Sequence, residues 1–176
     1  MSQLKVNSIV PVGGLPSGAN GGIIQVINVI KTDTFTTTST TPVDITGMTA
    51  TITPSSTSNK ILVVVDIGIL SASGGNGTYV NLLRGSTAIA VTTIGSGNLH
   101  TRSGFTSGGG GGISDAPRKM TTGGINFLDS PSTTSATTYK CQMSTSNSSY
   151  TSYFNRWGEN TDNASVSTIT LMEVTV

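Results

Sequence analysis

The single histidine, His100, is the first residue to consider for catalysis in this 176-residue chain. A catalytic triad needs a nucleophile beside a histidine and an acid that orients it. The Gly-x-Ser-x-Gly pattern that presents a nucleophilic serine does not occur in the sequence. His100 instead falls in a glycine- and serine-rich stretch, residues 95–122, which is typical of an exposed loop. We therefore predict no catalytic residue, and we expect the chain not to be an enzyme.

Acidic side chains are sparse, and the closest pair lies near the C-terminus. Glu159 and Asp162 are interspersed with Asn160 and Asn163, and side-chain oxygens of these kinds bind Ca²⁺. The segment lacks the alternating acids of a calcium-binding loop, so we interpret it as a solvated turn. We expect neither a metal site nor a cofactor.

Asp66 interrupts the most apolar run of the chain, residues 61–70. An unpaired charge inside a core is costly, because the carboxylate loses its hydration. We therefore expect Asp66 either to face a solvated side of its strand or to pair with a cation on another strand, such as Arg84.

Aromatic side chains are concentrated in one segment. Four of the chain's nine aromatic residues (four Phe, four Tyr and one Trp) fall within residues 150–157. Aromatic rings together with arginine anchor protein interfaces or stack against sugars. Two hypotheses stay open for this segment: ordinary packing or a self-association interface on the one hand, and glycan binding on the other. The candidate contact residues are Tyr150, Tyr153, Phe154, Arg156 and Trp157.

The elements that position these residues are predicted to be strands, because no helical apolar stripe persists and Thr, Val and Ile dominate. About eight to ten short strands separated by turns favour a β-sandwich of jelly-roll type or a barrel. The run 60–70 is apolar on both faces, which is typical of a central strand covered on both sides. Gly85–Ser86 predicts a two-residue hairpin turn. The expected strands are residues 23–31, 34–38, 43–53, 60–70, 78–84, 87–94, 123–128, 137–144 and 165–176.

Two parts are expected along the chain. Residues 1–20 form an extended arm and a Gly-rich linker, and residues 21–176 form the sandwich domain. Five consecutive glycines, Gly108–Gly112, indicate a loop of unassigned role. The arm alternates partly between apolar and polar residues and could dock on a partner through Leu4, Val6, Ile9, Val10 and Val12.

Composition excludes several classes of function. Charged residues make up only 10% of the chain and the net charge is +1, with no basic patch, so we expect no nucleic-acid partner. No apolar run reaches the ~20 residues of a membrane helix. One cysteine, Cys141, cannot form an internal disulfide. A hydroxyl-rich surface with few charges suits a protein that works outside cells or inside an assembly.

Several stretches resemble virion proteins of tailed phages, especially cyanophages. The opening Met-Ser-Gln-Leu-Lys-Val-Asn-Ser-Ile is similar to the start of phage fibre and appendage proteins. The body resembles a recurrent module of those virions at residues 22–31, Val-Asp-Ile-Thr-Gly-Met (43–48), Ile-Thr-Pro-Ser-Ser (52–56), Lys-Ile-Leu-Val (60–63), Asn-Leu-Leu-Arg-Gly (81–85), Phe-Leu-Asp-Ser-Pro (127–131) and 167–174. The resemblance implies a jelly-roll-like module that is commonly a homotrimer.

Together these observations predict a structural protein on the surface of a phage particle that is assembled in the host cytoplasm. The first hypothesis is a capsid decoration or cement protein, anchored by its arm to the major capsid protein or another virion protein. The alternative is a short tail fibre, appendage or receptor-binding tip that recognises a surface glycan through residues 150–157. Fold alone does not decide between them.

Overall fold

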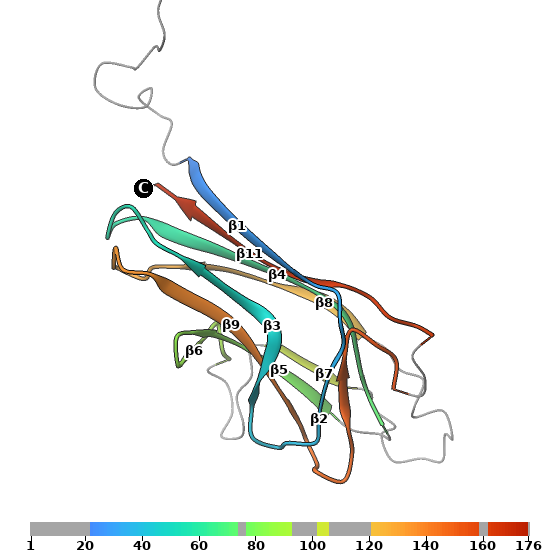
Figure 1. Ribbon diagram of the computed structural model, residues 1–176. Coiled ribbons are helices and arrows are strands. Elements are labelled where there is room, and N and C mark those ends of the chain that lie inside the picture. The colour runs from blue at the N-terminus through green and yellow to red at the C-terminus, as the bar shows by residue number, and fades with distance from the viewer. Residues whose placement is uncertain (1–21, 74–76, 93–101, 106–120, 159–161, 176) are drawn as a thin grey trace, which may run out of the picture.

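The structure is a computed structural model that describes residues 22–73, 77–92, 102–105, 121–158 and 162–175 (Figure 1). These residues form strands and no helix, so none of them forms a helix that could cross a membrane. The all-β prediction is confirmed. The strands are β1 (Ile23–Lys31), β2 (Phe35–Thr37), β3 (Val43–Ile52), β4 (Lys60–Ala72), β5 (Gly77–Arg84), β6 (Thr87–Ile89), β7 (Arg102–Phe105), β8 (Thr121–Asp129), β9 (Thr137–Thr145), β10 (Ser152–Phe154) and β11 (Ser167–Val174).

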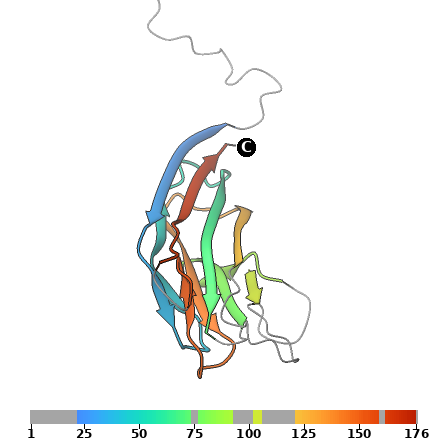
Figure 2. The same cartoon turned by 90° about the vertical axis from the view of Figure 1, so that its right-hand side faces the viewer.

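The strands form two antiparallel sheets that pack face to face (Figures 1 and 2). In the first sheet β1, β11, β4 and β8 lie side by side, and the short strands β10 and β2 extend it beside the far end of β4. In the second sheet the order is β3, β9, β5, and then β6 and β7, which share one edge of β5. With β6 and β7 counted as one strand and β2 and β10 left out, the chain-order positions read 1-8-3-6 and 2-7-4-5. This order is that of a jelly roll, so the predicted sandwich type is confirmed.

The core follows from alternation along the strands. Successive side chains of a strand point to opposite faces, so every second residue enters the space between the sheets. Strand β11 shows the pattern clearly, because Ser167, Ile169, Leu171 and Glu173 are buried while the residues between them are partly exposed. The buried apolar cluster comprises Ile45, Met48, Ala50, Ile52, Ile61, Val63, Val65, Ile67, Leu70, Val80, Leu82, Ile89, Ile125, Tyr139, Cys141, Met143, Phe154, Ile169 and Leu171.

The hairpin prediction at Gly85–Ser86 is confirmed, because β5 and β6 pair around these two residues. Gly85 has φ +59°, which a glycine adopts without strain and which the first residue of a type II′ turn requires. Strand β6 ends at Ile89, earlier than the predicted residue 94. Two short strands, β7 and β10, were not predicted.

Asn155 lies at the point where the strand paired with one edge of β4 changes from β11 to β10. One edge of β4 pairs with β11 along its first half and with β10 at its end, and Asn155 directly follows β10. Its side chain is fully buried and its φ is +62°. The Asn155 Nδ2 donates to the backbone oxygens of Lys31 (3.0 Å) and Asp33 (3.2 Å), while its Oδ1 accepts from Ser167 Oγ. One side chain therefore links the end of β1, the end of β10 and the start of β11.

The two ends of the described domain meet. The Thr175 N donates to Gly22 O at 3.0 Å, and the Gly22 N donates to Thr175 Oγ1 at 2.8 Å. The chain thus enters and leaves the sandwich at the same end of the first sheet (Figure 1). Residues 1–20 lie outside the described residues, so the division into an arm and a domain stays a prediction.

Candidate functional site

The outward side of the first sheet carries a row of apolar side chains in register. Val26 of β1 lies opposite Met172 of β11, which lies opposite Leu62 of β4, which lies opposite Leu128 of β8. The alternation that sends Ile61 and Leu171 inward sends these neighbours outward. We call the following residues the outer apolar face: Ile23, Ile24, Val26, Ile30, Leu62, Val64, Leu128, Met172 and Val174.

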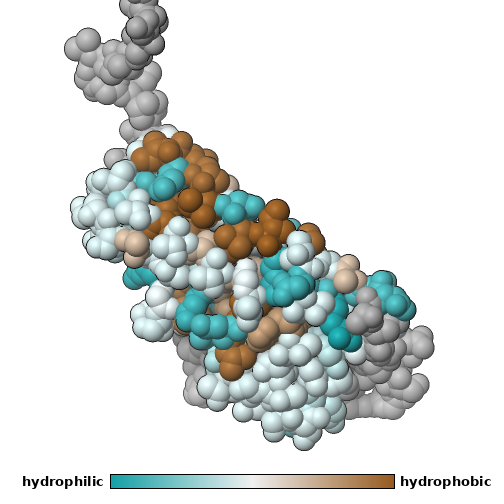
Figure 3. All heavy atoms as spheres, in the orientation of Figure 1, coloured by the Kyte–Doolittle hydropathy of each residue, from teal (hydrophilic) through white to brown (hydrophobic). Residues whose placement is uncertain are grey.

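The outer apolar face is exposed on its two outer strands, β1 and β8, and half-buried on β4 and β11 in the described part of the chain. Its β1 members are more than half exposed, from 54% for Ile24 to 58% for Ile30, and Leu128 is 48% exposed. Figure 3 shows apolar side chains gathered along this side of the molecule. Single exposed apolar residues are ordinary, but a contiguous set marks an interaction surface. The prediction that residues 60–70 are covered on both faces is therefore wrong for residues 60–66 of the isolated domain, whose outward side chains are exposed or half-buried. Beyond Asp66, Ser165 and Val166 lie against Gly68, and residues 70–72 are buried.

Polar groups on this face fall into two kinds. The Asn28 Nδ2 donates to Thr170 Oγ1 at 2.7 Å, which uses one donor of Asn28 and one acceptor of Thr170. Lys60 is the first residue of β4 and Asp66 lies in its middle, both on the outward side, and neither forms an ion pair within the described residues. Asp66 is exposed, so the first of the two expectations for it, a place on a solvated side of its strand, is confirmed.

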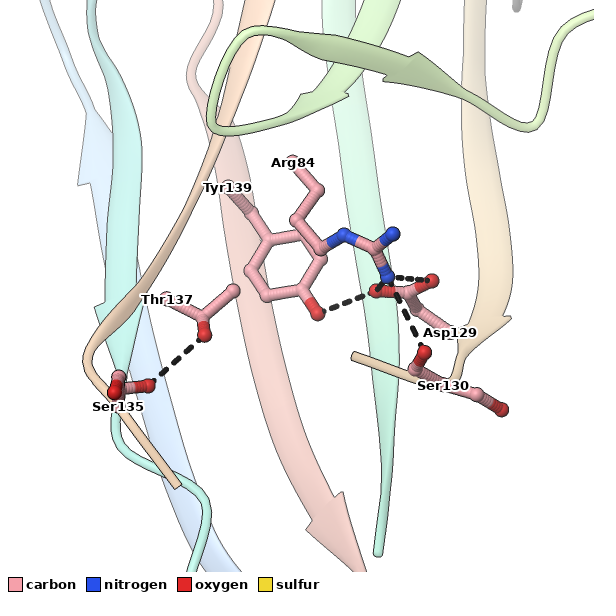
Figure 4. Close-up of polar contacts among 6 residues, drawn as sticks. All are labelled: Arg84, Asp129, Ser130, Ser135, Thr137 and Tyr139. Atoms are coloured by element: carbon pink, nitrogen blue, oxygen red, sulfur yellow. Dashed lines mark hydrogen bonds and ion pairs between the residues drawn. The ribbon is translucent and has the colours of Figure 1, made fainter. Parts of the chain in front are cut away.

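Arg84 pairs with Asp129 and not with Asp66 (Figure 4). The Arg84 guanidinium contacts both carboxylate oxygens of Asp129, at 2.9 and 2.8 Å, and the Tyr139 hydroxyl donates to the same carboxylate at 2.7 Å. Burial raises the pKa of Tyr139, and the hydrogen bond to the Asp129 carboxylate and its charge raise it further. The Tyr139 phenol therefore stays neutral at physiological pH, and the cluster joins β5, β8 and β9 rather than supplying a reactive group.

The aromatic segment is divided between the core and the surface. Phe154 is fully buried in the core, so it cannot contact a partner. On the other face of β10, Tyr153 is half-buried, and the Arg156 guanidinium carbon lies 4.8 Å from the centre of its ring. Tyr150 is exposed and Trp157 is half-buried. Four of the five candidate residues thus reach the surface, and neither hypothesis for them is tested by this arrangement.

The other residues with reactive or metal-binding side chains lie either in the core or outside the described residues. Burial raises the pKa of the Cys141 thiol to about 12, so it stays protonated at neutral pH. Among the described residues, no three His, Cys, Asp or Glu side chains are grouped as a metal site would need. Lying outside the described residues are His100, Glu159, Gly108–Gly112 and the arm residues Leu4, Val6, Ile9, Val10 and Val12.

Comparison with known proteins gives no family. No protein-family model matches the chain, and no curated protein matches it. Among solved structures, a chain of the infectious bursal disease virus Gx strain has 15% identity and a TM-score of 0.31, over 94% of this chain and 43% of that chain. A chain of the VP2 subviral particle of the same virus has 13% identity and a TM-score of 0.33, over 94% and 44%. This chain spans less than half of either one, and values this low support no inference about function.

Proposed function

We propose that this chain is a structural protein of a virus particle that works by contact, as a decoration or cement protein on the capsid of a tailed phage. The observation that carries the proposal is the outer apolar face of the jelly roll. Four strands present apolar side chains in one register, and such a surface is removed from water only when another molecule covers it. Such a surface fits a protein whose role is to form stable contacts with other protein chains.

Attachment to the particle is assigned to residues 1–20. Their apolar residues alternate partly with polar ones, and an extended segment gains affinity by adding backbone hydrogen bonds to the edge of a neighbour's sheet. This mode of binding needs no charge, in keeping with a chain in which charged residues make up 10%. The partner would be the major capsid protein or another virion protein, and the protein would reside on the particle surface.

Deletion of residues 1–20 tests this assignment. We expect the truncated chain to keep a strand-rich circular dichroism spectrum, because the hydrogen bonds between Gly22 and Thr175 that close the domain lie outside the deletion. We expect it to be absent from purified particles, and we expect the full chain to co-sediment with them and to be seen on the head by immunoelectron microscopy. Normal occupancy of particles by the folded, truncated chain would refute the assignment.

The fibre or receptor-binding tip is the second candidate, and one observation favours it. The Arg156 guanidinium lies over the Tyr153 ring on the half-buried side of β10, and Trp157, the next residue along the chain, is also half-buried. A cation and aromatic rings of this kind are groups on which sugars can stack. A Trp157→Ala variant that is retained on particles but abolishes adsorption to the host would favour this candidate. Particles that adsorb normally but lose heat stability without the protein would favour the cement role.

A further inference from the structure

Strands β1 and β4 of the first sheet carry apolar residues on both sides, although the domain covers only the inward side with its core. In β4 the inward residues Ile61, Val63 and Val65 are buried in the core, yet Leu62 and Val64 on the outward side are also apolar. In β1 the inward Ile27 and Val29 pack against the core, while the outward side carries apolar residues that are more than half exposed. Strands that are apolar on both sides are typical of sheets covered on both sides.

The charges on the same surface indicate what covers it. Along the outward side of β4 the residues read Lys60, Leu62, Val64 and Asp66, so an apolar stretch is bounded by a cation at one end and an anion at the other. At about 3.3 Å per residue these charges stand roughly 20 Å apart. A rotation of 180° about an axis that crosses the strands between Leu62 and Val64 exchanges the two ends. The surface is therefore complementary to itself.

From this self-complementarity we infer that a second copy of the chain covers the outer apolar face. The two first sheets pack face to face with their β4 strands antiparallel, at the roughly 10 Å separation of stacked sheets. Lys60 of each copy then faces Asp66 of the other copy, and Leu62 faces Val64. Along β1 the same rotation brings Ile24 towards Ile30 and Val26 towards Asn28, and along β11 it brings Met172 towards Thr170. Asn28 and Thr170 keep the bond to each other when they are covered, which offsets part of the cost of removing them from water.

The charge pattern favours this two-fold arrangement over the trimer that the sequence resemblance implies. The interface of a cyclic trimer is heterologous, so the outer apolar face of one copy would meet a different surface of the next copy. Packing of two identical faces on each other requires a two-fold axis, and this arrangement gives two Lys60–Asp66 pairs of opposite charge. The inference concerns self-association and does not depend on attachment to a particle.

Sedimentation of the purified full chain tests the first step. We expect a mass of two copies at micromolar concentration. Val26→Glu, on strand β1 of the outer apolar face, should give monomers. Thr49→Glu is the matched control, because Thr49 is an exposed residue of β3 in the other sheet, and it should leave the dimer intact. Both variants should keep the wild-type circular dichroism spectrum. A folded monomer or a trimer as the wild-type species, or equal effects of the two substitutions, would overturn the inference.

Charge exchange tests the proposed orientation. Lys60→Glu and Asp66→Lys each place like charges opposite each other in the two-fold arrangement, and each should raise the dimer dissociation constant at least about tenfold. The double variant Lys60→Glu/Asp66→Lys restores both pairs with reversed sign, so its dissociation constant should return to near the wild-type value. Absence of this rescue, or single variants that dimerise like wild type, would contradict the antiparallel arrangement.

Discussion

Glu173 shows how buried charge is used in this domain. The residue is 1% exposed, and its Oε1 accepts hydrogen bonds from Ser55 N (2.7 Å), Ser55 Oγ (2.7 Å) and Asn59 Nδ2 (2.6 Å). Ser55 and Asn59 lie in the turn between β3 and β4, where the chain passes from one sheet to the other. Burial raises the pKa of Glu173, but the hydrogen bonds outweigh it and leave the pKa below its ordinary value. The charged form therefore stabilises the turn.

The stability of the fold should depend on pH through Glu173. Since its folded-state pKa is lowered, its contribution is complete above the unfolded-state pKa of about 4.3 and is lost as pH falls through the folded-state pKa. At pH 7 we expect Glu173→Gln to lower the free energy of unfolding by about 2 kcal/mol, as for hydrogen bonds to a charged group. The gap from wild type should narrow below about pH 4.3.

Urea denaturation from pH 7 down to pH 3 measures that gap. Asp44→Asn is a suitable control, because Asp44 is 53% exposed in its ion pair with Lys140 and should cost less than about 1 kcal/mol. A gap between wild type and Glu173→Gln that stays constant over the whole range would contradict the role given to Glu173.

At the level of strands, the sequence predicts the long elements well and the short ones poorly. The β-branched, alternating runs of β1, β3, β4, β5, β9 and β11 were identified because each repeats its pattern over eight or more residues. Strand β10 has three residues, which is too few for a period, and its Phe154 was assigned to a contact surface although it belongs to the core. Strand pairing is decided by residues far apart in the chain, so the partner of Arg84 was not predictable from its neighbours.

Substitutions of Asn155 test how much its hydrogen bonds between β1, β10 and β11 contribute to stability. We expect Asn155→Ala to lower the free energy of unfolding by about 3 kcal/mol, because it removes the bonds to Lys31 O, Asp33 O and Ser167 Oγ and keeps a side chain at φ +62°. Asn155→Gly removes the same bonds but adopts positive φ freely, so it should be about 1 kcal/mol less destabilising. Chemical denaturation of both variants separates the two contributions. Equal losses would mean that the backbone conformation costs nothing.

For the molecule as a whole, the sequence predicts a strand covered on both sides, and the single domain covers only one side of it along residues 60–66. The apolar run of residues 60–70 predicted a strand covered on both sides, and in the folded chain β4 does lie between β11 and β8 with one side in the core. Its other side is open from Lys60 to Asp66 and is covered beyond that residue. Sequence periodicity reports that a face is to be covered, but it does not distinguish cover by the same chain from cover by another copy.

If a second copy supplies that cover, the thermal stability of the protein must depend on its concentration. Unfolding then includes dissociation, so mass action raises the melting temperature as concentration rises. A hundredfold increase should raise it by on the order of 3–5 °C for a chain of this size. Val26→Glu should melt at a lower temperature that does not change with concentration, whereas Thr49→Glu should follow wild type. Differential scanning calorimetry across that range makes the comparison. A wild-type melting temperature that does not depend on concentration would contradict the dimer. It would mean that the outer apolar face stays exposed in the purified protein and is covered, if at all, by a different molecule.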